Sequence, residues 1–152
     1  MASSNNAPSL ERSGGRIAVR RLQDVFHLPA CRTSVPEARR RVLATLYDWG
    51  ACQQTCEDAE LVVCELFTNA VRHADGESVE CEMTVIGDCL RVEVADGGTS
   101  RTEPMPRPRC AERESGRGLL LVGALSDSWG VRDRDQGPGR VVWADLPYRG
   151  LH

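Results

Sequence analysis

The sequence contains no lysine and few aromatic residues: all 19 basic residues are arginine, and aromatics are 5% of 152 positions. Codon bias in a high-GC genome is the simplest explanation for the missing lysine. No apolar run approaches the roughly 20 residues that span a bilayer. The opening "MASSNNAPSLERSGG" lacks the apolar core of a secretory signal. We therefore expect a cytoplasmic protein without a membrane segment.

The charge balance and the cysteines exclude further classes. A net charge of −3 gives no electrostatic reason to expect nucleic acid or an anionic membrane as partner. Seven cysteines are present, but no C-x-x-C pair occurs. Cys52 and Cys56 form the only close pair, and no second Cys or His pair follows for zinc. We interpret the cysteines as free thiols; a thiol sensor using Cys52, Cys56 or Cys110 is an alternative that oxidant-insensitive partner binding would exclude.

The length and the 41% hydrophobic fraction fit one domain with its own core. Residues 1–15, rich in Ser, Asn and Gly, are predicted to be a flexible tail, and residues 16–148 the folded domain. A first strand is expected over 17–28. Capping boxes at Ser34–Glu37 and Thr55–Asp58 predict two helices, the first ending at Gly50 and the second near residues 75–76.

In the second half of the chain the hydrophobic residues change from a helical to a strand-like period. Two strand-like runs flank Gly87-Asp88, and two more flank "DQGPG", which predicts two hairpins. Residues 97–115 have no periodicity and read as a long loop or lid. "GRGLLLVGALSD" predicts a helix that is apolar nearly all round and hence buried. The predicted fold is α+β, a two-layer sandwich of a mixed, mostly antiparallel sheet with helices on one face.

The second predicted helix carries an unusual polar stripe in "CELFTNAVRHA", made of Glu65, Asn69, Arg72 and His73. Its other side is apolar, with Val62, Leu66, Phe67 and Ala70. A stripe of this kind usually faces water. Two further signals change that interpretation.

The first signal is Asp96-Gly97-Gly98 after a strand, and the second is Gly116-Arg117-Gly118 before a helix. Each alone is an ordinary turn or a close-packing motif. Together with the stripe they suit nucleotide binding. Asp96 can accept a hydrogen bond from an exocyclic amine such as that of adenine, and Gly98 lets a base lie against bare backbone. Gly116 and Gly118 expose N–H groups at a helix N-terminus, where phosphate oxygens are favoured.

The polar stripe supplies the remaining chemistry. Asn69 offers a neutral oxygen to Mg²⁺, which is commonly shared between protein, phosphates and water. Glu65, one turn away, can polarise a hydroxyl or water that attacks the γ-phosphate.

Three segments in this order resemble the histidine-kinase-like (GHKL) ATPase superfamily: "ELFTNAVRHA" its N-box, "VADGG" its first Gly box and "GRGLLLV" its second. The small size and "FHLPACRTSVPEARRRV" resemble one branch, the bacterial anti-sigma-factor serine kinases. The resemblance covers residues 17–147. It implies Glu65 as base, Asn69 on Mg²⁺ and Asp96 on adenine. The candidate cofactor-binding residues are Asn69, His73, Asp96, Gly98, Gly116, Arg117 and Gly118.

The resemblance also implies ATP with Mg²⁺ under a mobile lid at residues 97–115, and often a homodimer. The partners of that branch are a sigma factor and a STAS-domain antagonist that is phosphorylated on Ser or Thr. His73 lies inside the N-box, and no dimerisation helix with a separate His precedes it. We therefore reject a sensor histidine kinase.

The sequence departs from the family pattern at two places. Ser100 stands where the first Gly box commonly has another Gly, and Arg140-Val141 stand where the last hairpin often has a Gly-Thr pair near adenine. Two hypotheses follow. The chain is a protein serine/threonine kinase that also sequesters a sigma factor, or a catalytically weak partner-switching module of the same fold. Glu65 and Asn69 favour the kinase, because they serve phosphoryl transfer itself.

Overall fold

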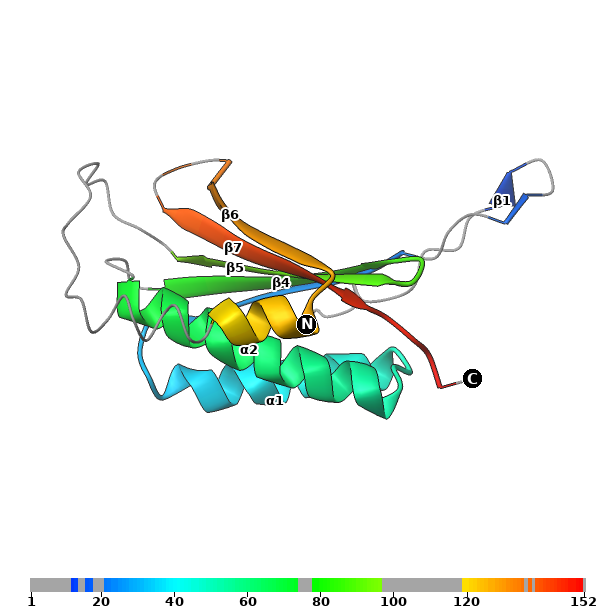
Figure 1. Cartoon of the computed structure of the whole chain (residues 1–152), viewed down its shortest axis with the longest axis horizontal. Coiled ribbons are helices and arrows are strands. Elements are labelled where there is room, and N and C mark those ends of the chain that lie inside the picture. Colours follow the sequence, from blue (N-terminus) through cyan, green and yellow to red (C-terminus); the bar gives the residue numbers. More distant parts are fainter. Residues whose placement is uncertain are drawn as a thin grey trace.

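The computed structural model describes residues 21–73, 78–96, 119–135, 137 and 139–151, and the backbone of two short strands, β1 (Arg12–Ser13) and β2 (Arg16–Ile17). Helices α1 (Ser34–Asp48) and α2 (Gln53–His73) lie on one face of a five-stranded sheet (Figure 1). Residues 119–125 form a further helix. The strand order is β3 (Arg21–Pro29), β4 (Ser78–Ile86), β5 (Cys89–Asp96), β7 (Arg140–Pro147) and β6 (Ser128–Asp133).

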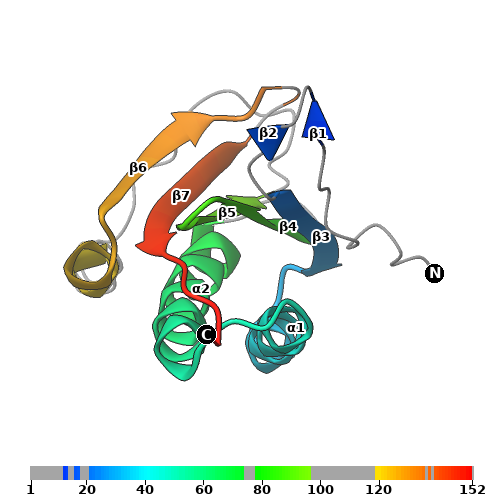
Figure 2. The same cartoon turned by 90° about the vertical axis from the view of Figure 1, so that its right-hand side faces the viewer.

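The predicted α+β sandwich is confirmed: α1 and α2 lie beneath the strands, and no described helix covers the opposite face of the sheet (Figure 2). We call that opposite face the open face. Every neighbouring pair in the five-stranded sheet is antiparallel, so the described sheet is not mixed. Both predicted hairpins form, β4–β5 around Gly87 and β6–β7 around Gly137.

Alternation of buried and half-buried residues along β4 and most of β5 places the core between sheet and helices. Alternate residues of β4 and β5 are buried, and their neighbours lie on the open face. The alternating buried residues of these two strands are Val79, Cys81, Met83, Val85, Leu90, Val92 and Val94, and Ala95 and Asp96 at the end of β5 are buried as well. They pack against the apolar sides of α1 and α2 and form with them one buried hydrophobic cluster in the described part of the chain.

The ends of the helices correct the sequence prediction in detail. Gly50 does follow α1, with φ of 78° and its N–H bonded to the carbonyl of Tyr47, as predicted for a helix stop. Ser34, however, is the first residue of α1 and not its cap, which is Thr33. Likewise α2 begins at Gln53, so Thr55 lies within its first turn. The Thr55 hydroxyl instead accepts a hydrogen bond from the backbone N–H of Arg149 at 3.2 Å.

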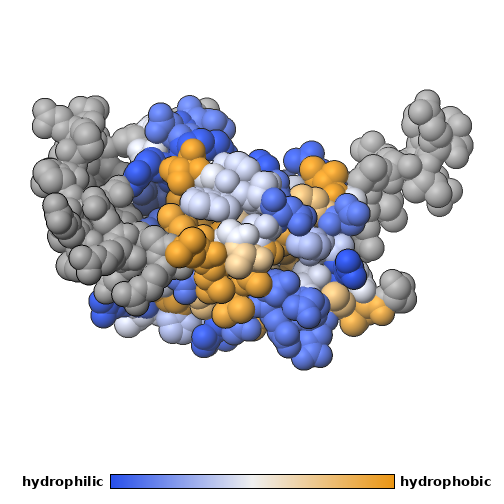
Figure 3. All heavy atoms as spheres, in the orientation of Figure 1, coloured by the Kyte–Doolittle hydropathy of each residue, from blue (hydrophilic) through white to orange (hydrophobic). Residues whose placement is uncertain are grey.

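The helix of residues 119–125 is less buried than its composition predicted. Val122 is fully buried, and Leu119 and Leu125 pack against the core, but Leu120 is 75% exposed. Apolar side chains gather over this part of the surface in Figure 3. The helix lies beside Trp129 of the edge strand β6. Only one side of the helix therefore packs against the sheet. No helix in the described ranges is long and apolar enough to cross a membrane.

Candidate functional site

Helix α2 presents one apolar side and one polar side, as its sequence predicted. Val62, Leu66 and Phe67 are fully buried against the sheet. Glu65 and Asn69, one turn apart, are only half-buried. A carboxylate and an amide are therefore held at the border between core and solvent, where a ligand can reach them.

Asp96 is the last residue of β5 and the one charged residue that is buried in the described part of the chain, with 9% of its surface exposed. By the alternation of β5, it shares the helix-covered face of the sheet with Val94 and Val92. Within the described residues, only Oδ1 of its carboxylate is hydrogen-bonded, to the backbone N–H of Arg140 at 3.2 Å. A carboxylate has a second oxygen that can also accept a hydrogen bond, and the exocyclic amine of adenine is a suitable donor.

The chain connection places the end of α2 near Asp96. Only residues 74–77 separate His73 from Ser78, the first residue of β4. The next residue, Val79, is the register partner of Asp96. The end of α2 and the end of β5 therefore lie at the same edge of the molecule (Figure 1). The fold therefore brings the N-box on α2 and the start of the first Gly box at the end of β5 to the same edge.

The other predicted site residues lie outside the described part of the chain. These are the side chain of His73, the loop 97–115, and Gly98, Gly116, Arg117 and Gly118. Their predicted roles stay predictions. The amide oxygen of Asn69 is the described group that would hold Mg²⁺ alongside the phosphates. Within the described ranges no three His, Cys, Asp or Glu side chains lie close enough to hold a metal ion by themselves.

The structure adds a part of the site that the sequence prediction missed, the loop between β6 and β7. Arg134 donates from Nη1 to the backbone oxygen of Asp96 at 3.3 Å, and Gly139 packs directly against Asp96. The sequence predicts this loop only as a Gly/Pro turn, with no Gly-Thr pair after it. The Gly-Arg step at 139–140 was the available signal, because glycine beside a strand end permits close backbone approach.

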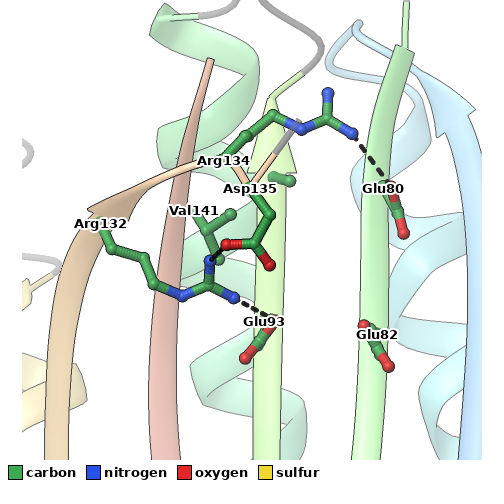
Figure 4. Close-up of a pocket in the computed structure, with 8 residues that line it drawn as sticks. Glu80, Glu82, Glu93, Arg132, Arg134, Asp135 and Val141 are labelled. Atoms are coloured by element: carbon green, nitrogen blue, oxygen red, sulfur yellow. Dashed lines mark hydrogen bonds and ion pairs between the residues drawn. The ribbon is translucent and has the colours of Figure 1, made fainter. Parts of the chain in front are cut away.

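A cavity of about 290 Å³ lies on the open face, away from α2 (Figure 4). Its charged lining residues are Glu80, Glu82, Glu93, Asp135, Arg132 and Arg134. Both arginines are already paired with carboxylates: Arg132 with Glu93 at 3.0 Å and Arg134 with Glu80 at 3.3 Å. Since carboxylates outnumber arginines there, the cavity repels phosphate and is not the nucleotide site.

Comparison with known proteins bears on this geometry. A search of curated protein sequences finds no significant match. Residues 28–145 match the family model of the histidine kinase-like ATPase domain. The match begins at the last two residues of β3 and ends within β7, and it includes α2, Asp96 and the β6–β7 loop. Because this match covers more than half of the sequence, and the helix-covered antiparallel sheet is consistent with it, the chain belongs to the histidine kinase-like ATPase domain family.

Proposed function

We propose that the chain binds Mg-ATP between the end of β5 and helix α2, and transfers the γ-phosphate to Ser or Thr of a STAS-domain antagonist. In the same proposal it sequesters a sigma factor. The observation that carries the proposal is Asp96, a buried carboxylate at a strand end, beside the end of the helix that holds Glu65 and Asn69. Family membership supports ATP as the nucleotide.

Each described residue has one task in this proposal. The carboxylate of Asp96 accepts a hydrogen bond from the 6-amino group of adenine, a charged hydrogen bond worth about 1.5–3 kcal/mol when shielded from water. Asn69 would hold Mg²⁺, which neutralises charge on the phosphates when bound. Glu65 accepts the proton of the attacking hydroxyl.

A partner-switching module without kinase activity is the second candidate. The β7 residues that replace the Gly-Thr pair have no side-chain hydroxyl, and Val141 lines the open-face cavity. Adenine would then lose one contact. A module of this kind binds its partner with weak or structural use of ATP.

The binding half of the proposal is tested with Asp96→Asn. We expect Mg-ATP affinity to fall by about tenfold or more, because an amide is a weaker acceptor than a carboxylate. Tripolyphosphate affinity should stay within twofold of wild type. Asp133→Asn is the matched control, since Asp133 also ends a strand but is exposed. Isothermal titration measures all three proteins; equal ATP affinity in Asp96→Asn would remove Asp96 from the site.

The chemical half is tested with Glu65→Gln, which keeps the shape but removes the charge that accepts a proton. Phosphotransfer from labelled ATP to STAS-domain proteins of the same genome should fall by about 10²–10⁴, with ATP affinity changed only a few-fold. Asn69→Ala should lose Mg²⁺-dependent affinity as well as rate. Glu60→Gln is the control: Glu60 also lies on α2 but pairs with Arg39 at 3.5 Å. If wild type binds a sigma factor yet transfers no phosphate to any of these proteins, the module is the function.

A further inference from the structure

The loop between β6 and β7 holds Asp96 at two points. The backbone N–H of Arg140 donates to Oδ1 of Asp96 at 3.2 Å. Nη1 of Arg134 donates to the backbone oxygen of the same residue at 3.3 Å. One contact fixes the carboxylate and the other fixes the backbone that carries it. Both the side chain and the backbone carbonyl of Asp96 are therefore held by hydrogen bonds from this loop.

Gly139 allows the β6–β7 loop to approach Asp96 closely. A Cβ at this position would lie 2.6 Å from the backbone oxygen of Asp96 and 2.7 Å from its Oδ1. The residue also has φ of +113°, a conformation that side chains disfavour. Any other residue at 139 would have to push Asp96 away or open the loop.

Arg134 itself is anchored from the open face. Its Nη2 donates to Oε1 of Glu80 at 3.3 Å (Figure 4), and His27 lies 3.5 Å from the same oxygen. The side chains of Arg134 and Glu80 are 26% and 29% exposed, so the pair is largely shielded. The guanidinium group therefore spans from β4 to the end of β5 with both of its ends engaged.

We propose that Arg134 and Gly139 are positioning residues that orient Asp96 toward the 6-amino group of adenine, and so set the preference of the site for adenine. This rests on the proposed ATP function. A carboxylate discriminates an amine from other groups only when its acceptor oxygen has a fixed direction, because hydrogen bonds weaken steeply with poor alignment. In this chain the backbone N–H of Arg140 and the guanidinium group of Arg134 supply that direction.

The test compares Mg-ATP with Mg-purine riboside triphosphate, which lacks only the 6-amino group. Arg134→Ala should lower ATP affinity by about three- to tenfold, the worth of roughly one hydrogen bond, and leave the analogue unchanged. Arg132→Ala is the matched control. Arg132 is paired with Glu93 at 3.0 Å on the same face, and its described contacts do not include Asp96. It should keep the wild-type ratio of the two affinities.

A second pair of variants, Gly139→Ala and Gly137→Ala, controls for a general loosening of the loop. Gly139→Ala should also lower the ATP-to-analogue ratio. Gly137→Ala should not: Gly137 has φ of +79°, and a Cβ there would meet nothing within 4 Å. Strain alone would affect both glycine variants and both ligands.

The outcomes separate this inference from the proposed function. If wild type does not prefer ATP over the analogue, the adenine contact and this inference are both wrong. A second outcome overturns the positioning role alone. In that outcome wild type prefers ATP and Asp96→Asn loses the preference, but Arg134→Ala and Gly139→Ala both retain it. Loss of the ratio in both variants, with the controls at the wild-type value, supports it.

Discussion

At the scale of single residues, the described cysteines differ strongly in environment. Cys31 is exposed, and its thiol lies 3.1 Å from the hydroxyl of Thr33 and 3.5 Å from that of Ser34. Hydrogen bonding to Thr33, and secondarily to Ser34, lowers the pKa of Cys31. Cys81 is fully buried in the core, and burial raises its pKa strongly. The thiolate is the reactive form, so the two thiols lie at opposite ends of reactivity.

Alkylation at neutral pH should therefore modify Cys31 much faster than Cys81. Peptide mass spectrometry after timed exposure to iodoacetamide measures both rates. Thr33→Ala should slow Cys31 labelling severalfold, because it removes the main hydrogen bond that stabilises the thiolate. Labelling of Cys81 before Cys31 in the folded protein would contradict the described burial.

At the scale of elements, β5 and β7 are joined on the open face by a pair of directly opposed residues, Arg91 and Asp145. Nε and Nη2 of Arg91 donate to the two carboxylate oxygens of Asp145 at 2.7 and 2.9 Å. The guanidinium group also lies 4.4 Å from the ring centre of Trp143. Hydrogen bonding to Arg91 lowers the pKa of Asp145 below its ordinary value of 3.8.

Asp145→Asn, which resembles the protonated acid, should lower the free energy of unfolding by about 1 kcal/mol at neutral pH. A folded-state pKa below the unfolded value means that the stabilisation is complete above the ordinary pKa and is lost as the pH falls through the folded one. The difference between wild type and variant should therefore close below about pH 4. Urea unfolding from pH 7 to pH 3 measures it. Asp135→Asn is the control, because that side chain is 89% exposed.

At the scale of the whole molecule, the C-terminal segment joins the end of the sheet to the turn between α1 and α2. The N–H of Cys52 donates to the carbonyl of Arg149 at 2.8 Å, and the N–H of Arg149 donates to the hydroxyl of Thr55 at 3.2 Å. The N–H of Leu151 donates to the carbonyl of Gly50 at 2.9 Å. Residues about a hundred positions apart in the sequence thus meet at the start of α2.

A chain ending at Tyr148 should lose all three contacts, and its free energy of unfolding should fall by about 1–3 kcal/mol, since each contributes modestly and freeing the segment regains entropy. A chain ending at Gly150 loses only the Leu151 contact and should lose less. Thermal or urea unfolding of the three proteins gives the series. Equal stability of the full-length and the shortest chain would show that the segment is not structural.

Much of the fold was predictable because each element encodes its own buried side. Alternation in β4 and β5 and the apolar side of α2 specified which residues face the core, and Gly50 and Gly87 marked a helix end and a hairpin. Asp96, Glu65 and Asn69 were predicted as site candidates from the same patterns, because they are polar residues beside the buried sides of β5 and α2.

Local pattern alone determined the elements, their buried faces and the candidate residues of α2 and β5. The tertiary structure alone decided where α2 begins, because a contact between Thr55 and Arg149 replaces the predicted cap. It also decided what holds Asp96, since Arg140 and Arg134 lie 44 and 38 positions away in the chain. Periodicity records which side of an element meets the core, whereas contacts between distant loops depend on how the strands are ordered in the sheet, and no local pattern carries that order.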